Sequence, residues 1–159
     1  MDNVPIKVLL RLFSSNVVPV LLYGCEVWGA YVLGRTNSFD MFKNKFFSVV
    51  SDIEKLHLKF CKRVLGVHSK TTNLAVYAEL GRVPMIVQIS VSIVKYWLRV
   101  NHSLYEEELV GKAAHSCIQS KTQGVKFVDY LLEMCNIKSL NNIIVTTSSD
   151  ISLLVKYLN

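Results

Sequence analysis

The clearest chemical pattern in this sequence is a set of four cations in the segment SDIEKLHLKFCKRVLG, which runs from Ser51 to Gly66. At about 100° per residue, these cations gather on one side of a helix. Cations one turn apart on a rigid helix can contact successive phosphates, which gives affinity for a polyanion without reading its sequence. A basic helix face is often only solvated surface, but the pattern also predicts four candidate nucleic-acid-binding residues: Lys55, Lys59, Lys62 and Arg63.

A histidine and a cysteine on the same segment raise the question of a metal site. His57 and Cys61 are four residues apart, so a helix would place them on one face. Two ligands do not complete a zinc site, however, and the remaining candidates, His115 and Cys117, belong to a different element. Filling of a hydrophobic core is the more ordinary role of such a pair. We therefore expect no metal and no cofactor.

Catalytic motifs are missing from the sequence. It contains no glycine-rich phosphate loop, no HExxH, no CxxC and no nucleophile elbow. The five aspartates are isolated from one another, so no adjacent pair can hold two magnesium ions: Asp2, Asp40, Asp52, Asp129 and Asp150. We expect no catalytic residues and no enzyme activity from this chain as it stands. An active site assembled from dispersed residues remains an alternative.

The element that must position the cations is a helix of about four turns. Ser51 and Glu54 have the spacing of a capping box, and Gly66 suits the left-handed position that ends a helix. Six apolar residues fall on one arc of this helix and predict its buried side: Ile53, Leu56, Phe60, Cys61, Val64 and Leu65. The helix should therefore be packed on one side and basic on the other.

The most apolar stretch extends from Val17 to Gly34 and raises the question of a membrane span. Glu26 lies in its middle, and Pro19 and Gly24 interrupt its regularity. A charge at that depth costs about 2.5–3.5 kcal/mol on insertion scales. We therefore expect a buried core helix and no membrane association.

Helical spacing and end signals also occur on both sides of these segments. The state of residues 35–50, which carry four phenylalanines, stays open between a connector and a short helix. Asn142–Thr147 is compatible with loop or strand. Helices are expected over Val4–Phe13, from Thr71 or Thr72 to Leu80 with Gly81 at the end, over Pro84–Asn101, after a capping box at Ser103 and Glu106, over Gly124–Met134 and over Ser149–Leu158.

Composition sets limits on the whole chain. With 159 residues, 51% of them hydrophobic and 19% charged, the chain can form the core of one ordinary domain. Residues 43–70 contain seven basic and two acidic residues, so 7 − 2 = +5 of the net charge of +6 lies there. Four widely spaced cysteines and no secretory signal indicate reduced thiols in an intracellular protein, with nothing to distinguish nucleus from cytoplasm.

The order of several short motifs resembles one known family. These motifs are VVPVLLYGCEVWG from Val17, IEKLHLKFCKRVLGVHSKTTNLAVYAELGRVPM from Ile53 to Met85, and KYW from Lys95 to Trp97. Together they resemble the region after the palm in reverse transcriptases of non-long-terminal-repeat (LINE-type) retrotransposons, across roughly residues 5–105. The palm motif, an aromatic residue and alanine followed by two aspartates, is missing, as are the fingers and the endonuclease.

The resemblance implies a noncatalytic fragment of an RNA-directed DNA polymerase, namely the helical thumb that grips the template–primer duplex. Its basic positions match Lys55, Lys59, Lys62 and Arg63. The implied partner is RNA or an RNA–DNA duplex, held through its shape, phosphates and 2′-hydroxyls. The missing palm, or another protein, is a further partner expected on the apolar surface. The alternative is a helical interaction or structural module with no nucleic-acid role, in which the lysines only keep an apolar chain soluble.

These observations predict an all-α fold, an irregular bundle of about six or seven helices. Residues 1–105 should form the thumb-like region, and residues 106–159 a helical extension packed on it. An exposed apolar patch is expected on the helices before Gly34. The predicted core residues are Leu21, Leu22, Trp28, Leu56, Phe60, Val64, Leu80, Ile89, Ile93 and Trp97.

Overall fold

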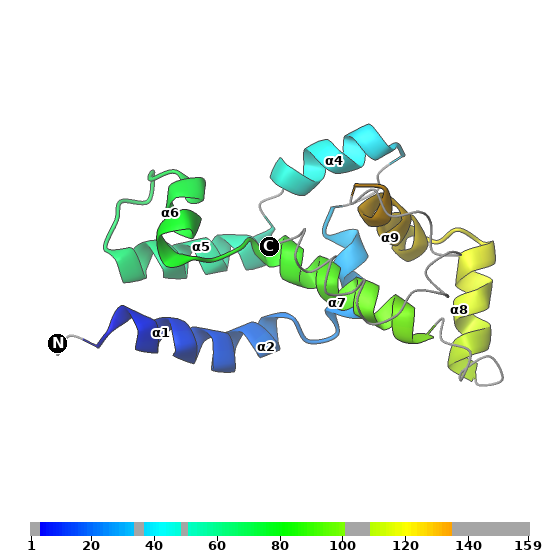
Figure 1. The fold of residues 1–159 in the computed structure, drawn as a ribbon, viewed down its shortest axis with the longest axis horizontal. Coiled ribbons are helices and arrows are strands. Elements are labelled where there is room, and N and C mark those ends of the chain that lie inside the picture. The colour runs from blue at the N-terminus through cyan, green and yellow to red at the C-terminus, as the bar shows by residue number, and fades with distance from the viewer. Residues whose placement is uncertain (1–3, 34–36, 49–50, 101–108, 135–159) are drawn as a thin grey trace. The chain divides into compact units, whose positions relative to one another are not determined.

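The structure is a computed structural model that describes residues 4–33, 37–48, 51–100 and 109–134, and all regular elements within these ranges are helical (Figure 1). The all-α prediction is therefore confirmed. The described residues form eight continuous helices, against the six or seven expected: Ile6–Leu21, Cys25–Tyr31, Phe39–Ser48, Asp52–Leu65, Asn73–Leu80, Met85–Val100, Leu109–Gln119 and Gln123–Met134.

The chain divides into two compact units, each made of two separate stretches of sequence. Unit 1 takes Met1–Gly24 and Val50–Ile86, and unit 2 takes Cys25–Val49 and Val87–Asn159. The predicted boundary between residues 105 and 106 lies outside the described residues.

Unit 1 is built around α5 (Asp52–Leu65), which contacts both α1 (Ile6–Leu12) and α6 (Asn73–Leu80) (Figure 1). The rings of Phe13 and Phe60 stack with centroids 4.0 Å apart. The guanidinium of Arg82 donates a hydrogen bond to the carbonyl of Leu10 at 2.9 Å, so the turn after α6 is tied back to α1. Burial of aromatic rings and this long-range hydrogen bond hold the first stretch of unit 1 against the second.

The helix at the start of unit 1 changes its winding before a proline. A π-helical turn, η1 (Phe13–Val17), separates α1 from α2 (Val18–Leu21), and the amide of Val18 bonds to the carbonyl of Phe13. Pro19 has no N–H and its ring would clash with the carbonyl of Ser15 in a regular helix. The wider turn gives that carbonyl room, which explains the change of winding at this point.

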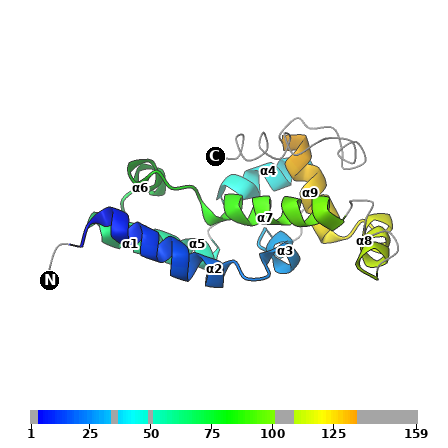
Figure 2. The ribbon, with the colours of Figure 1, turned by 60° about the horizontal axis from the view of Figure 1, so that its bottom comes forward.

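Unit 2 packs α9 (Gln123–Met134) against α4 (Phe39–Ser48) and against η2, the 3₁₀ turn Gly29–Tyr31 that continues α3 (Cys25–Trp28) (Figure 2). The rings of Phe42 and Phe127 form a T-shaped pair with centroids 5.4 Å apart, and both side chains are buried. Helix α7 (Met85–Val100) begins in unit 1 and contributes Ile89, Ile93 and Trp97 to the core of unit 2. Helix α8 (Leu109–Gln119) leads into α9.

The single buried helix predicted for residues 17–34 is wrong. The helix ends at Leu21, and a new one starts at Cys25 after Gly24, whose φ of 65° is left-handed and breaks the helix. Val20, Val27 and Tyr31 are exposed, so this stretch is also less buried than its composition suggested. Among the described residues no single helix is long and apolar enough to cross a membrane, although Ile6–Leu21 with Cys25–Tyr31, and Asn73–Leu80 with Met85–Trp97, meet those criteria as interrupted pairs.

Most helix ends agree with the end signals in the sequence. Thr72 precedes α6 and Gly81 ends it in a left-handed conformation, while α7 starts directly after Pro84. The segment left open at 35–50 contains α4, where Ser38 Oγ accepts a hydrogen bond from the amide of Met41 at 3.3 Å. The capping box at Ser103, the run Asn142–Thr147 and the helix at Ser149–Leu158 lie outside the described residues.

The predicted core is correct in α7 and partly wrong in α5. Ile89, Ile93 and Trp97 are buried, but Leu56 is 45% exposed. The buried residues of α5 are instead Glu54, His57, Leu58 and Cys61, a stripe at i, i+3, i+4 and i+7 that is rotated from the predicted arc. The other predicted core residues are partly exposed: Leu21, Leu22, Trp28, Phe60, Val64 and Leu80.

Large apolar side chains before Gly34 are exposed, as expected. In unit 1 the exposed fraction reaches 75% at Val20 and 86% at Tyr23, and α1 buries none of its residues. Single exposed apolar residues are common on proteins, but so many within one short stretch of sequence are unusual. In unit 1 they are Val4, Ile6, Val8, Leu12, Val20 and Tyr23.

Candidate functional site

The helix that carries the candidate cations has well-defined ends. At its start, Ser51 Oγ accepts a hydrogen bond from the amide of Glu54 at 3.2 Å. At its end, Gly66 is left-handed, and the amide of Val67 reaches back to the carbonyl of Lys62 at 3.1 Å. Both ends therefore have satisfied backbone groups, as the sequence predicted, and α5 is a fully formed helix of 14 residues.

The structure places the four predicted cations on one side of α5. They lie within about 100° of one another around the helix axis at 100° per residue. Lys55, Lys59 and Arg63 are exposed and follow one another at intervals of four residues, which is about 6 Å along the axis. Lys62 is half-buried between them. We refer to Lys55, Lys59, Lys62 and Arg63 as the basic face.

Two members of the basic face have partners within the chain. Lys55 Nζ lies 2.8 Å from Asp52 Oδ1, and this hydrogen bond and positive charge hold the pKa of Asp52 below its usual value. Both side chains are exposed, so water screens the pair and a phosphate can replace the carboxylate. Lys62 Nζ donates a hydrogen bond to the carbonyl of Ser69 at 2.7 Å, which ties the loop after α5 to the helix. Lys55, Lys59 and Arg63 are therefore the cations best placed to meet a ligand.

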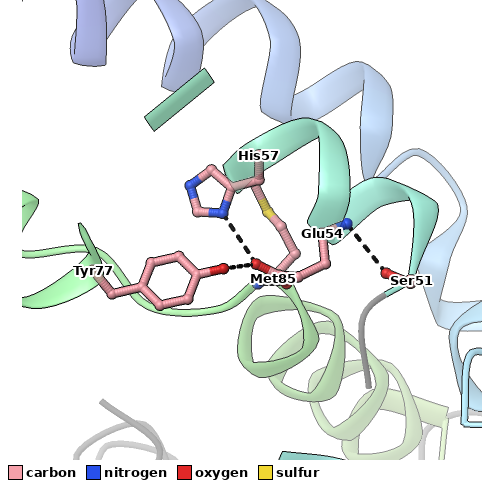
Figure 3. Close-up of polar contacts among 5 residues, drawn as sticks. All are labelled: Ser51, Glu54, His57, Tyr77 and Met85. Atoms are coloured by element: carbon pink, nitrogen blue, oxygen red, sulfur yellow. Dashed lines mark hydrogen bonds and ion pairs between the residues drawn. The ribbon is translucent and has the colours of Figure 1, made fainter. Parts of the chain in front are cut away.

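The opposite side of α5 carries a buried polar cluster, the Glu54 cluster, formed by Glu54, His57, Tyr77 and Met85 (Figure 3). Glu54 Oε1 accepts a hydrogen bond from the hydroxyl of Tyr77 and lies 3.4 Å from His57 Nδ1. Glu54 Oε2 accepts a hydrogen bond from the amide of Met85 at 2.6 Å. Glu54 is 4% exposed and His57 is 1% exposed, so this carboxylate depends on protein donors instead of water.

Each member of the Glu54 cluster is positioned by a different local feature. Glu54 and His57 are three residues apart on α5, so they share a face. Tyr77 comes from the middle of α6, and Met85 is the first residue of α7. Within unit 1, the carboxylate therefore joins α5, α6 and the first residue of α7 at one point.

The cluster changes the pKa of two of its members. Burial lowers the pKa of His57, but hydrogen bonds to Cys61 and Glu54 and the negative charge near the ring more than offset burial and raise this pKa to about 9. Burial raises the pKa of Tyr77, and the hydrogen bond to Glu54 raises it further. At neutral pH, Tyr77 is therefore a protonated donor and His57 is a cation beside Glu54.

His57 and Cys61 are both buried on α5, as the core interpretation of this pair required. Within the described ranges, no group of three or more His, Cys, Asp or Glu side chains is arranged to hold a metal ion. The ring of His57 also lies 5.7 Å from the rings of Phe13 and Tyr77, between centroids. The surroundings of His57 are thus aromatic and acidic, which suits a cation enclosed in a core.

Glu54 and Tyr77 were not recognised as a site from the sequence. The sequence predicts a capping box because Glu54 lies three residues after Ser51, and the backbone of Glu54 does take part in that cap. Its side chain instead turns into the core, toward a partner 23 residues away and another 31 residues away. The one sequence signal for this cluster is a glutamate that shares the buried face of the helix with a histidine.

We compared the chain with protein-family models, curated proteins and solved structures, and none of them matches it.

Proposed function

We propose that this chain is a noncatalytic, thumb-like helical element of the retrotransposon reverse transcriptase type, which binds an RNA or RNA–DNA template–primer duplex through the basic face of α5. The observation that carries the proposal is the row of exposed cations Lys55, Lys59 and Arg63, one turn apart on a capped helix. The resemblance in motif order supplies the class of ligand.

The geometry suits contact with phosphates. Cations on a rigid helix keep a fixed register along a nucleic-acid backbone, and they lose less conformational freedom on binding than cations on a loop. Contacts of this kind carry no base specificity, which is what a polymerase requires of the element that holds its moving duplex. The Glu54 cluster supports this role, because it fixes the side of α5 that faces away from the ligand.

The test is binding of a fluorescent RNA–DNA hybrid across a salt series. The test variant carries Lys55→Gln, Lys59→Gln and Arg63→Gln, since glutamine keeps the helix propensity and removes the charge. The matched control carries Lys43→Gln, Lys112→Gln and Lys126→Gln, which removes the same charge from three exposed lysines of unit 2.

Wild type and control should bind in the micromolar range at low salt with a log–log salt slope of roughly −2 to −4. The test variant should lose about one unit of slope for each phosphate contact removed. Equal loss in both triple variants would mean that net charge alone is responsible. No binding by folded wild type at low salt would overturn the proposal.

A second candidate function rests on the exposed apolar side chains of unit 1. An interaction module would use the surface around Leu12 and Val20 to contact a protein, and the resemblance names the missing palm as one such partner. Sedimentation across a concentration series tests it. Association that weakens in a Leu12→Ser, Val20→Ser variant, in a protein that binds no hybrid, would favour the interaction module over the thumb.

A further inference from the structure

The Glu54 cluster encloses a charged group in the core of unit 1, in a place that the proposed nucleic-acid interface does not use. Glu54, His57 and Met85 are each at most 4% exposed, and no buried side-chain nitrogen or oxygen in the described residues lacks a hydrogen-bond partner. A carboxylate enclosed in this way is stable only if its donors and a compensating positive charge stay in place.

The groups that face the His57–Glu54 pair come from four elements. From its own helix these are Glu54 and the thiol of Cys61, and from α6 the hydroxyl of Tyr77. From η1 the ring of Phe13 is uncharged. From the start of α7, the backbone amide of Met85 donates to Glu54. His57, with Nδ1 3.4 Å from Glu54 Oε1, is therefore placed to carry the positive charge that compensates this carboxylate.

We propose that Glu54 and His57 form a proton-controlled latch that holds α6 and the first turn of α7 against α5. With its proton, His57 neutralises the buried carboxylate, which then accepts hydrogen bonds from Tyr77 and from the amide of Met85. Without the proton, the core contains an uncompensated negative charge, and the structure avoids that cost by exposing Glu54 to water.

The segment released by such an opening can be identified from the contacts. Glu54 itself stays in the first turn of α5, where its amide is bonded to Ser51. The bonds that break on exposure of the carboxylate lead to Tyr77 in α6 and to Met85 in α7. The opening should therefore loosen residues 76–85 and leave the basic face of α5 formed, so it is separable from the proposed function.

The direction of the pH dependence follows from the His57 shift. A group whose pKa is higher in the folded state stabilises the fold fully below its unfolded pKa, here 6.5, and loses that contribution as the pH rises through its folded pKa, about 9. The latch is thus closed near pH 6.5 and opens between pH 6.5 and 9. A pKa rise of this size limits the change in the equilibrium constant for opening to roughly 300-fold.

The test combines two measurements on the full chain between pH 6 and 10. The first follows the His57 ring protons by NMR, with the His57→Gln spectrum used to assign them. The second measures hydrogen exchange of residues 76–85, with each rate divided by the intrinsic rate at the same pH. Protection of this segment should fall at least about tenfold between pH 7 and 9.5, and should level off above the pKa at which the His57 ring of the folded protein titrates.

Two variants and one control separate the latch from general alkaline loosening. Glu54→Gln removes the charge and keeps one acceptor oxygen in place of two, so the pH dependence of protection at residues 76–85 should weaken. His57→Gln cannot titrate, so there this pH dependence should disappear. The control Glu79→Gln removes an exposed carboxylate from α6 and should behave as wild type. A His57 that titrates at or below 6.5, or wild-type protection that does not change with pH, would overturn the latch, as would a pH dependence as steep as that of wild type in both variants.

Discussion

Glu54 and Met85 are 31 residues apart in sequence, yet the carboxylate of one accepts a hydrogen bond from the amide of the other at 2.6 Å. Met85 is the first residue of α7, and Pro84 before it has no side chain that can cap a helix. The carboxylate of Glu54 therefore does for α7 what a capping side chain does within its own helix: it satisfies a free amide and places negative charge at the positive end of the helix dipole. One buried residue thus couples the start of α5 to the start of α7.

Tyr77→Phe tests how much the cluster contributes to stability. The substitution removes one donor to a buried carboxylate without opening a large cavity, so the free energy of unfolding should fall by about 1–3 kcal/mol. Urea unfolding followed by circular dichroism measures the change. Tyr31→Phe is the matched control, because Tyr31 is 66% exposed and should change stability by less than about 0.5 kcal/mol. Equal effects of the two substitutions would contradict a stabilising role for the Tyr77 hydroxyl.

The ends of the helices could be predicted from the sequence because they depend on a few neighbouring residues. Ser51 and Gly66 act within one turn of the groups they cap, and Gly81 ends α6 in the same way. The break at Gly24 is equally local, but the apolar composition of residues 17–34 predicts a continuous helix across it. Capping residues and glycines therefore predict the ends of these helices from local sequence alone.

The buried side of α5 could not be predicted as well, because hydrophobicity alone set the predicted arc. Leu56 was placed in the core, whereas Glu54 and His57 occupy it. Polar residues enter a core when distant donors satisfy them, and the donors here are Tyr77 and the amide of Met85. The spacing of apolar residues within α5 does not reveal these distant donors.

A pair of leucine substitutions tests the observed orientation of α5. Leu58 is 7% exposed, so Leu58→Ala should cost about 2–5 kcal/mol of unfolding free energy through lost burial and a cavity. Leu56→Gln should stay within about 0.5 kcal/mol of wild type, because Leu56 is 45% exposed and glutamine keeps the helix propensity. If the arc predicted from sequence were buried instead, Leu56→Gln would lower the free energy of unfolding by a large amount. Denaturant midpoints of the two variants decide between the orientations.

The described cysteines should differ in their reaction with an alkylating reagent under native conditions. Cys25 is 1% exposed and burial raises the pKa of its thiol, while Cys61 is fully enclosed. Cys117 in α8 is partly exposed and should be labelled first. Peptide mass spectrometry over a time course measures the order, and labelling in urea provides the control for intrinsic reactivity. Rapid native labelling of Cys61 would show that the core of unit 1 opens readily.

Gly29 and Gly124 of unit 2 differ in the space available for a Cβ atom. A Cβ atom at Gly29 would lie 2.4 Å from Ile89 Cγ2 and 3.0 Å from Ile93 Cδ1, and both isoleucines are fully buried. Gly29→Ala should therefore lower the free energy of unfolding by about 1–3 kcal/mol. At Gly124 the same atom would meet the ring of Trp97 at 3.6 Å, an ordinary contact.

Gly124→Ala should accordingly be neutral, or should stabilise the protein by up to about 1 kcal/mol through better helix propensity in α9. A double-mutant cycle identifies the source of the Gly29 effect. Ile89→Ala removes the clashing methyl group, so adding it to Gly29→Ala should cost less than the sum of the two single substitutions. Additive losses would mean that the methyl at residue 29 disturbs something other than Ile89. Equal effects of Gly29→Ala and Gly124→Ala would contradict the close approach of η2 to α7, on which the packing of unit 2 depends.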